Sequence, residues 1–238
     1  MTESKARPIT LQEFDDRAAL AEALAERICE TLERAIAEKG EAVMAVSGGS
    51  TPKLLFEALS KRNPGWVNVT VSLVDERFVP PEDERSNQRL VSTYLLKDAA
   101  AEATFVPLYQ HVDDVDAAAA LASGKIDTLA LPFDVAILGM GTDGHTASFF
   151  PGGDNLEAAT DPGERRSVLA MHAGGAEEPR LTLTLPQLVA STMLVLHIEG
   201  GNKREALDRA REPGPASEMP IRSILDAVER PLEVYWAA

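Results

Sequence analysis

Apolar residues occur along the chain in two patterns that alternate: a large aliphatic residue at every fourth position, and short continuous apolar runs. In residues 18–37, leucine or isoleucine stands at every fourth position with Glu and Arg between, which is the spacing of one apolar helix face. The next segment, Ala42–Val46 (AVMAV), is short and continuously apolar, as a buried strand is. After the turn SGGST, Pro52 stands near the start of a helix predicted over 52–60. This part of the chain therefore predicts a strand, a glycine turn and a helix.

The same alternation continues to the C-terminus. Strands that alternate with helices favour a largely parallel, Rossmann-like α/β sheet with helices on both faces. The sequence contains no internal repeat and no long polar linker, so residues 1–238 are expected to form a single domain. The further strands are predicted at 67–74, 134–140, 167–171, 180–185, 192–198 and 232–236, and the further helices at 86–97, 113–129, 202–211 and 220–228.

Composition narrows the classes of partner. Lys and Arg total 23 against 38 Asp and Glu, which gives a formal net charge of −15 and argues against nucleic acid or an anionic membrane as partner. No apolar run approaches the roughly 20 residues of a membrane span, and the N-terminus lacks the apolar core of a signal peptide. Cys29 is the single cysteine, so neither a disulfide framework nor a thiolate metal cluster is expected. We expect a soluble cytoplasmic protein that needs neither metal nor cofactor.

Three of the predicted strands end in polar or glycine-bearing loops. These loops are SGGST after Val46, DERF after Val74 and GMGTDGHTAS after Leu138. Ligands of parallel α/β sheets bind beyond the carboxyl ends of the strands. If the strands are parallel neighbours, the three loops open onto one edge of the sheet and form the candidate site.

The SGGST loop has the chemistry of an anion cradle. Gly48 and Gly49 lie between the hydroxyl residues Ser47, Ser50 and Thr51, just before a predicted helix. Backbone N–H groups and hydroxyls in such a loop can converge on an anion at the helix N-terminus. A plain helix-capping turn accounts for the same residues equally well, so the pattern alone leaves both interpretations open.

The GMGTDGHTAS loop contains the best candidate for a catalytic base. Gly139, Gly141 and Gly144 surround Asp143 and His145, which brings backbone close to whatever binds there. A carboxylate two residues away can orient an imidazole and stabilise its protonated form. Histidine has an ordinary pKa of about 6.5, which suits it to take a proton from water. These neighbours favour a catalytic histidine over a structural one.

Cations near the same edge are candidates for anion binding. Strand alternation is expected to send Asp75 and Arg77 to one side and Glu76 to the other. Lys203 stands in the first turn of a predicted helix, where a cation opposes the helix dipole unless an anion binds beside it. Arg180, before LTLTLP, could supply a further cation. The alternative for each is a solvated surface charge.

Taken together, these motifs resemble a known family. The segments SGGSTPKLLFEAL, DERFVPPEDERSNQRL, ILGMGTDGHTASFFPG, PRLTLTLP and GGNKREAL follow one another over most of the chain. In this order they resemble the 6-phosphogluconolactonases, within the superfamily of glucosamine-6-phosphate isomerases and deaminases. The resemblance implies hydrolysis of the phosphosugar lactone 6-phospho-D-glucono-1,5-lactone to 6-phosphogluconate. This is the second step of the oxidative pentose phosphate pathway, and the resemblance implies no metal requirement.

The resemblance also implies roles for individual residues. It places His145 as the base that activates water and Asp143 as its partner. It places Arg77 and Lys203 at the substrate phosphate, with residues 47–51 lining the same pocket.

Three further residues complete the predicted site. Asp75 is expected to contact sugar hydroxyls or to hold Arg77, and Arg180 matches a recurrent family arginine of undefined role. Backbone N–H groups of the glycine loops, including Gly144, are expected to line the pocket and to receive the developing oxyanion.

Two other functions remain as alternatives. Glucosamine-6-phosphate deaminases share the DGH element but have an acidic residue a few positions after the histidine. Here TASFFPG follows His145, with no Asp or Glu before Asp154. A non-catalytic phosphosugar sensor would need the cations but not the pair Asp143 and His145. The sequence carries no signal for an oligomeric state.

Overall fold

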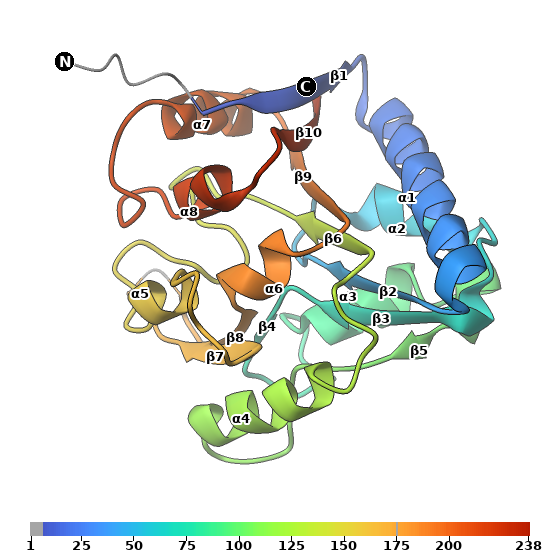
Figure 1. The fold of residues 1–238 in the computed structure, drawn as a ribbon, viewed down its shortest axis with the longest axis horizontal. Coiled ribbons are helices and arrows are strands. Elements are labelled where there is room, and N and C mark those ends of the chain that lie inside the picture. The colour runs from blue at the N-terminus through green and yellow to red at the C-terminus, as the bar shows by residue number, and fades with distance from the viewer. Residues whose placement is uncertain (1–6, 175) are drawn as a thin grey trace.

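The computed structural model describes residues 7–174 and 176–238, and its centre is a parallel β-sheet (Figure 1). The strands of this sheet are β1 (Ile9–Phe14), β2 (Ala42–Val46), β3 (Val69–Leu73), β5 (Thr104–Phe105), β6 (Val135–Leu138), β9 (Met193–Glu199) and β10 (Leu232–Ala237). Their order is β1-β10-β9-β6-β2-β3-β5, and every neighbouring pair is parallel. The predicted Rossmann-like sheet is confirmed.

A second, antiparallel sheet differs from the prediction. It contains β4 (Asp75–Arg77), β7 (Val168–Met171) and β8 (Arg180–Leu183), in the order β4-β8-β7. The first three residues of the DERF segment therefore form a strand of their own, β4, and not a loop. Val74 joins the two sheets, because its N–H donates to Val46 O of the large sheet while its carbonyl accepts from Leu183 N of the small one.

Helices lie on both faces of the large sheet, as predicted. In Figure 1, α1 and α2 cover one face, while α6, α8 and the small sheet lie toward the other. The Asp16 side chain caps the start of α1, and Gly40 ends it with a φ of 84°. The helices are α1 (Arg17–Lys39), α2 (Lys53–Ser60), α3 (Asn87–Tyr94), α4 (Val115–Ile126), α5 (Leu156–Ala159), α6 (Leu185–Val189), α7 (Gly201–Arg211) and α8 (Ile221–Ala227), with 3-10 turns at Trp66–Asn68 and Asp98–Glu102.

Several predicted boundaries need correction. The strand predicted at 67–74 begins only at Val69, because Trp66–Asn68 forms a 3-10 turn. The strand predicted at 180–185 ends at Leu183, since Leu185 begins α6 with a proline in its first turn. The helix predicted at 86–97 ends at Tyr94. Strand β1 was not predicted.

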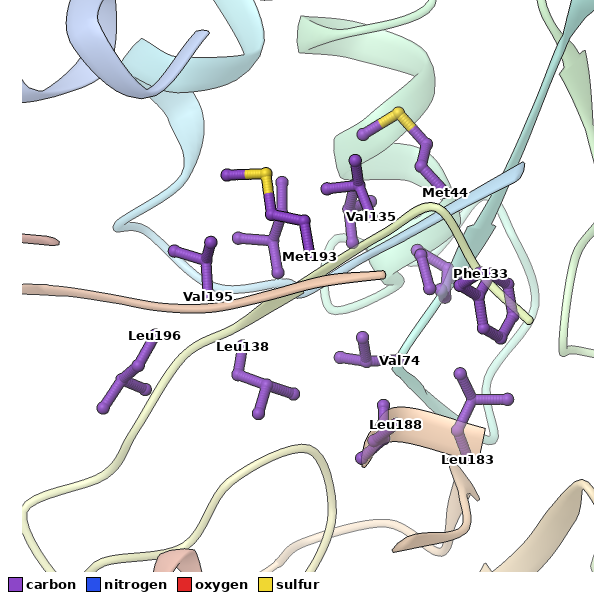
Figure 2. Packing of buried hydrophobic residues seen from close by; sticks show 14 of the residues in the cluster. Met44, Val74, Phe133, Val135, Leu138, Leu183, Leu188, Met193, Val195 and Leu196 are labelled. Atoms are coloured by element: carbon purple, nitrogen blue, oxygen red, sulfur yellow. The ribbon is translucent and has the colours of Figure 1, made fainter. Parts of the chain in front are cut away.

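The central strands are buried on both faces. Figure 2 shows Val135 and Leu138 of β6 pointing to opposite sides of the sheet, and Val195 and Leu196 of β9 do the same. All four side chains are fully buried, which accounts for their continuously apolar sequence. Leu188 of α6 packs on the same side as Leu138. Within the described residues, none of the helices combines the length and apolar character that a transmembrane span requires.

Candidate active site

All three predicted segments follow neighbouring strands at the same edge of the large sheet, because β3, β2 and β6 are adjacent and parallel. Strands β2 and β6 pair directly, so the loops that follow them emerge side by side. A side chain added at Gly139 would lie 3.8 Å from Ser47 Oγ. The DERF segment leaves β3 through Val74 and then forms β4 of the small sheet, where Asp75 Oδ2 accepts a hydrogen bond from Ser148 Oγ of the GMGTDGHTAS loop. The predicted meeting of the three segments at one edge is therefore observed.

The pair Asp143 and His145 is formed as predicted. His145 Nδ1 lies 2.7 Å from Asp143 Oδ1, and the same oxygen accepts the His145 backbone N–H at 3.2 Å. A Cβ at Gly141 would come within 2.2 Å of His145 Nδ1 and 2.3 Å of Asp143 Oδ1, so only glycine fits there. An ionised Asp143 accepts the Nδ1 proton, which leaves Nε2 as the nitrogen with a free lone pair. The dyad is thus arranged for proton abstraction.

The ionisation of Asp143 is set by the groups around it. Burial raises the pKa of Asp143, but the charge of His145 and the hydrogen bonds from its backbone and ring together outweigh this effect. The pKa of Asp143 therefore lies below its ordinary value. Asp143 stays ionised at neutral pH, where it holds the imidazole in one tautomer.

Neighbouring elements hold the loop that carries the dyad. Gly144 adopts a φ of 79°, and its carbonyl accepts the N–H of Ile221 at 2.8 Å. A Cβ at Gly144 would lie 2.9 Å from Met219 Cβ. Arg209 of α7 donates to Thr142 O at 2.9 Å. The loop is therefore fixed from α7 and from the segment that leads into α8.

Two arginines from the small sheet face each other next to the dyad. Arg77 of β4 and Arg180 of β8 are register partners. The Arg180 guanidinium carbon lies 5.8 Å from the Phe150 ring centre, which in turn lies 4.7 Å from the His145 ring centre. The Arg180 side chain is only 11% exposed. Its Nε and Nη1 groups make no hydrogen bond with any of the described residues. These donors remain for a ligand.

The electrostatics of this pair favour an anion. Burial, and after it the neighbouring charge of Arg77, lowers the pKa of Arg180. An arginine nevertheless stays protonated in proteins. Acids already offset part of this positive charge, since Arg180 Nη2 lies 3.5 Å from Glu178 Oε2 and the charges of Asp75, Glu178 and Glu76 act to raise the pKa of Arg180. The two donors of Arg180 that are unpaired within the described residues are what makes this place suited to an anionic group.

The acids of DERF point in opposite directions, as predicted. Asp75 is buried, and its Oδ2 accepts a hydrogen bond from Ser148 Oγ at 2.7 Å. Glu76 is fully buried and accepts the backbone N–H groups of Arg77, Asn87 and Gln88, each at 2.7 Å. Burial raises the pKa of Glu76 to about 7, against the lowering effect of these hydrogen bonds. Glu76 thus anchors the start of α3, a role that sequence reasoning missed.

The SGGST loop does not use its hydroxyls to cap a helix. Helix α2 begins at Lys53 after Pro52, and no side-chain hydrogen bond caps it. Ser47 is buried, Ser50 is exposed and Thr51 is half-buried. The capping interpretation of the sequence is therefore wrong for this turn, and the loop is left available to bind a ligand.

Lys203 lies on α7 and not on one of the three loops. It stands in the first turn of α7, the helix whose Arg209 contacts the dyad loop. Across residues 7–174 and 176–238, no hydrogen bond or salt bridge links Lys203 to another predicted site residue. In the same described part of the chain, no cluster of three or more His, Cys, Asp or Glu side chains is placed to hold a metal ion.

The sequence of the chain matches the model of one protein family. Residues 15–236 match the family model described as glucosamine-6-phosphate isomerases/6-phosphogluconolactonase. The chain belongs to this family of phosphosugar enzymes.

Individual proteins similar to this chain show which type of enzyme within the family it is. A 6-phosphogluconolactonase of Rhizobium meliloti is 58% identical over 94% of this chain and 97% of its own length, and one of Mesorhizobium japonicum is 52% identical over 94% and 93%. The crystal structure of a 6-phosphogluconolactonase from Shewanella baltica has a TM-score of 0.95 at 35% identity, over 99% of this chain and 100% of that one. Within the family, the chain is an enzyme of the 6-phosphogluconolactonase type.

Proposed function

We propose that this chain hydrolyses 6-phospho-D-glucono-1,5-lactone to 6-phospho-D-gluconate, the second step of the oxidative pentose phosphate pathway, by attack of a water that His145 activates. The observation that carries the proposal is the 2.7 Å contact between His145 Nδ1 and Asp143 Oδ1, which reserves Nε2 for the proton of water. The similarity to named 6-phosphogluconolactonases supports the substrate class.

In this proposal, the substrate is bound by positively charged side chains and by the loop at residues 47–51. The substrate phosphate is bound by Arg77 and Lys203, and the N–H groups and hydroxyls of residues 47–51 line the same pocket. Asp75, held by Ser148, faces the sugar hydroxyls. Arg180, with two unused donors beside Arg77, contributes to the anionic part of the pocket.

Hydrolysis needs one base that later acts as an acid. Water attacks C1 of the lactone while Nε2 of His145 takes its proton, and Asp143 stabilises the resulting imidazolium. Backbone N–H groups of the glycine loops, including Gly144, stabilise the oxyanion of the tetrahedral intermediate. The intermediate then breaks the bond between C1 and the ring oxygen, and the imidazolium returns its proton to that oxygen. The product is an open-chain acid, with no covalent enzyme intermediate.

The direct test is the rate at which the purified protein removes freshly generated 6-phosphogluconolactone. Spontaneous hydrolysis must be measured in parallel and subtracted. We expect clear acceleration, together with no release of ammonium from glucosamine-6-phosphate. An absence of acceleration contradicts the proposal. Ammonium release would instead support the deaminase alternative, and binding without turnover would support the sensor.

Arg77→Ala is expected to raise KM far more than His145→Ala does. The guanidinium contacts a part of the substrate that does not react, so it contributes to binding of ground state and transition state alike. Steady-state kinetics of both variants check this difference. Equal effects on KM and kcat in both variants would show that the two roles are assigned wrongly.

The salt dependence of kcat/KM reports on the global charge. A protein with a formal net charge of −15 repels a phosphorylated substrate at long range. Salt at 0.1 M screens this repulsion beyond a Debye length of about 10 Å. We expect kcat/KM to rise, or at least not to fall, up to this concentration. A steep fall would mean that attraction by the local cations dominates.

A further inference from the structure

The side chain of Asn87 connects two segments of the candidate site. Asn87 is the first residue of α3 and is 1% exposed. Its Nδ2 donates to the backbone carbonyl of Asp75 at 2.9 Å. On its other side the amide packs against Gly48, since a Cβ added at Gly48 would lie 1.8 Å from Asn87 Oδ1 and 2.2 Å from Cγ. The amide occupies the space that any side chain at position 48 would need.

Asn87 has little freedom to move away from Gly48. Its backbone N–H is bound to Glu76 Oε1 at 2.7 Å, and its Nδ2 is bound to Asp75 O. Both partners belong to β4, so the strand that also carries Arg77 holds the backbone of Asn87 at one point and its side-chain amide at another.

The oxygen of this amide has an unusual environment. Asn87 Oδ1 is buried and accepts no hydrogen bond from any of the described residues. A buried acceptor without a partner lowers stability, and such groups in native proteins call for an explanation. An apolar side chain of similar size would fill the space without this penalty. However, an apolar residue could not donate the hydrogen bond to the carbonyl of Asp75. This hydrogen bond links the side chain that packs under the loop at residues 47–51 to β4.

We propose that Asn87 is a positioning residue for phosphosugar binding: its amide forms the floor of the loop at residues 47–51 and fixes the spacing between this loop and β4. The inference rests on the proposed function, because it takes that loop as the cradle of the substrate phosphate. Residues 47–51 and Arg77 bind one phosphate only if they stand at the correct separation, and the contact between Asn87 and Gly48 sets this separation.

A double-mutant cycle tests the contact. Gly48→Ala is expected to raise KM on the order of a hundredfold, because displacements near 1 Å have effects of this size. Asn87→Ala removes one hydrogen bond and the floor of the loop, and it is expected to raise KM about tenfold, with a smaller change in kcat. In the double variant Gly48→Ala/Asn87→Ala the clash is absent, so KM is expected to return to that of Asn87→Ala.

Two controls separate this contact from general effects. Gly124→Ala adds a methyl where nothing lies within 4 Å, and Ser92→Ala changes an exposed residue of α3. Both are expected to keep the kinetic constants of the original protein. Calorimetric affinity for 6-phosphogluconate gives a readout independent of turnover, and it is expected to follow the same order as KM. Thermal melting shows whether each variant is folded.

The outcomes distinguish the two proposals. If the original protein neither hydrolyses the lactone nor binds 6-phosphogluconate, the proposed function fails. If it does both, but Gly48→Ala is equally impaired with and without Asn87, the positioning role is overturned. If Gly48→Ala does not fold, Asn87→Ala decides the matter: a raised KM supports the role, and an unchanged KM overturns it.

Discussion

We expect His145→Ala to lower kcat by about 10²–10⁴-fold, the usual contribution of a general base, while KM changes little. The substitution removes Nε2, the proposed acceptor of the water proton, and leaves the cations proposed to bind the phosphate. Initial rates with freshly generated lactone, corrected for spontaneous hydrolysis, measure both constants.

The chain offers a matched control for this variant. His172 also contacts a carboxylate, with 2.9 Å between its Nδ1 and Asp154 Oδ2, and its side chain is also partly exposed. We expect His172→Ala to leave kcat unchanged, because this second pair lies outside the proposed site. A similar loss in both variants would point to a general effect of removing a histidine. Full activity in His145→Ala would move the base elsewhere.

The geometry of the dyad can be tested without removing either partner. Gly141→Ala places a methyl group within 2.3 Å of both Asp143 Oδ1 and His145 Nδ1. The two side chains must then separate, which removes the orientation of the imidazole. We expect kcat to fall in this variant as well, although less than in His145→Ala.

Glu76→Ala is expected to lower the free energy of unfolding by about 3–5 kcal/mol, near the upper end for single substitutions. The change leaves one buried and two partly buried backbone N–H groups without their acceptor, and an unsatisfied buried group costs about 1–3 kcal/mol. Chemical denaturation at pH 7 measures the difference. Glu84→Ala is the control, because it removes an exposed carboxylate two residues before Ser86, and its effect is expected to stay within about 0.5 kcal/mol. Equal stability of both variants would contradict the anchoring role.

The pH dependence of this effect follows from the raised pKa of Glu76. Its pKa is about 7 in the folded protein against an ordinary value of 4.5. Between these two values the folded state keeps a proton that the unfolded state has lost, so the contribution of Glu76 to stability falls as pH rises. A shift of this size corresponds to about 3 kcal/mol.

A neutral variant isolates this contribution. Glu76→Gln removes the titrating group, and the difference in unfolding free energy between the original protein and this variant is expected to shift in favour of the variant from about pH 4.5 to 7. The comparison cancels the titration of the other carboxylates. A difference that is independent of pH would mean that Glu76 has no raised pKa.

The large sheet was predictable because each of its central strands can be recognised from its own apolar sequence. Strands such as β2 and β6 are buried on both faces, and this burial requires the continuous apolar runs that the sequence shows. The small sheet was missed in part because β4 consists of three charged residues whose strand conformation depends on pairing with β8. Strand β1 was missed because its partner lies at the other end of the chain.

The same distinction applies to the site. Asp143 and His145 stand two residues apart, so their contact could be anticipated from local sequence alone. The roles of Glu76 and Asn87 could not, because they appear only when α3 folds back onto β4 and brings Asn87 under Gly48. The one available signal was the SN pair that follows DERF along the chain, and its meaning depends on the tertiary fold.

The place of β1 at the edge of the sheet has a consequence for biosynthesis. Among the described strands, β1 pairs with β10 alone, and β10 also pairs with β9. Strand β1 must therefore wait until β10 has been synthesised, while the strands between them can already assemble. Domains begin to fold during translation. In this protein, β1 can join the sheet only after β10 has been synthesised.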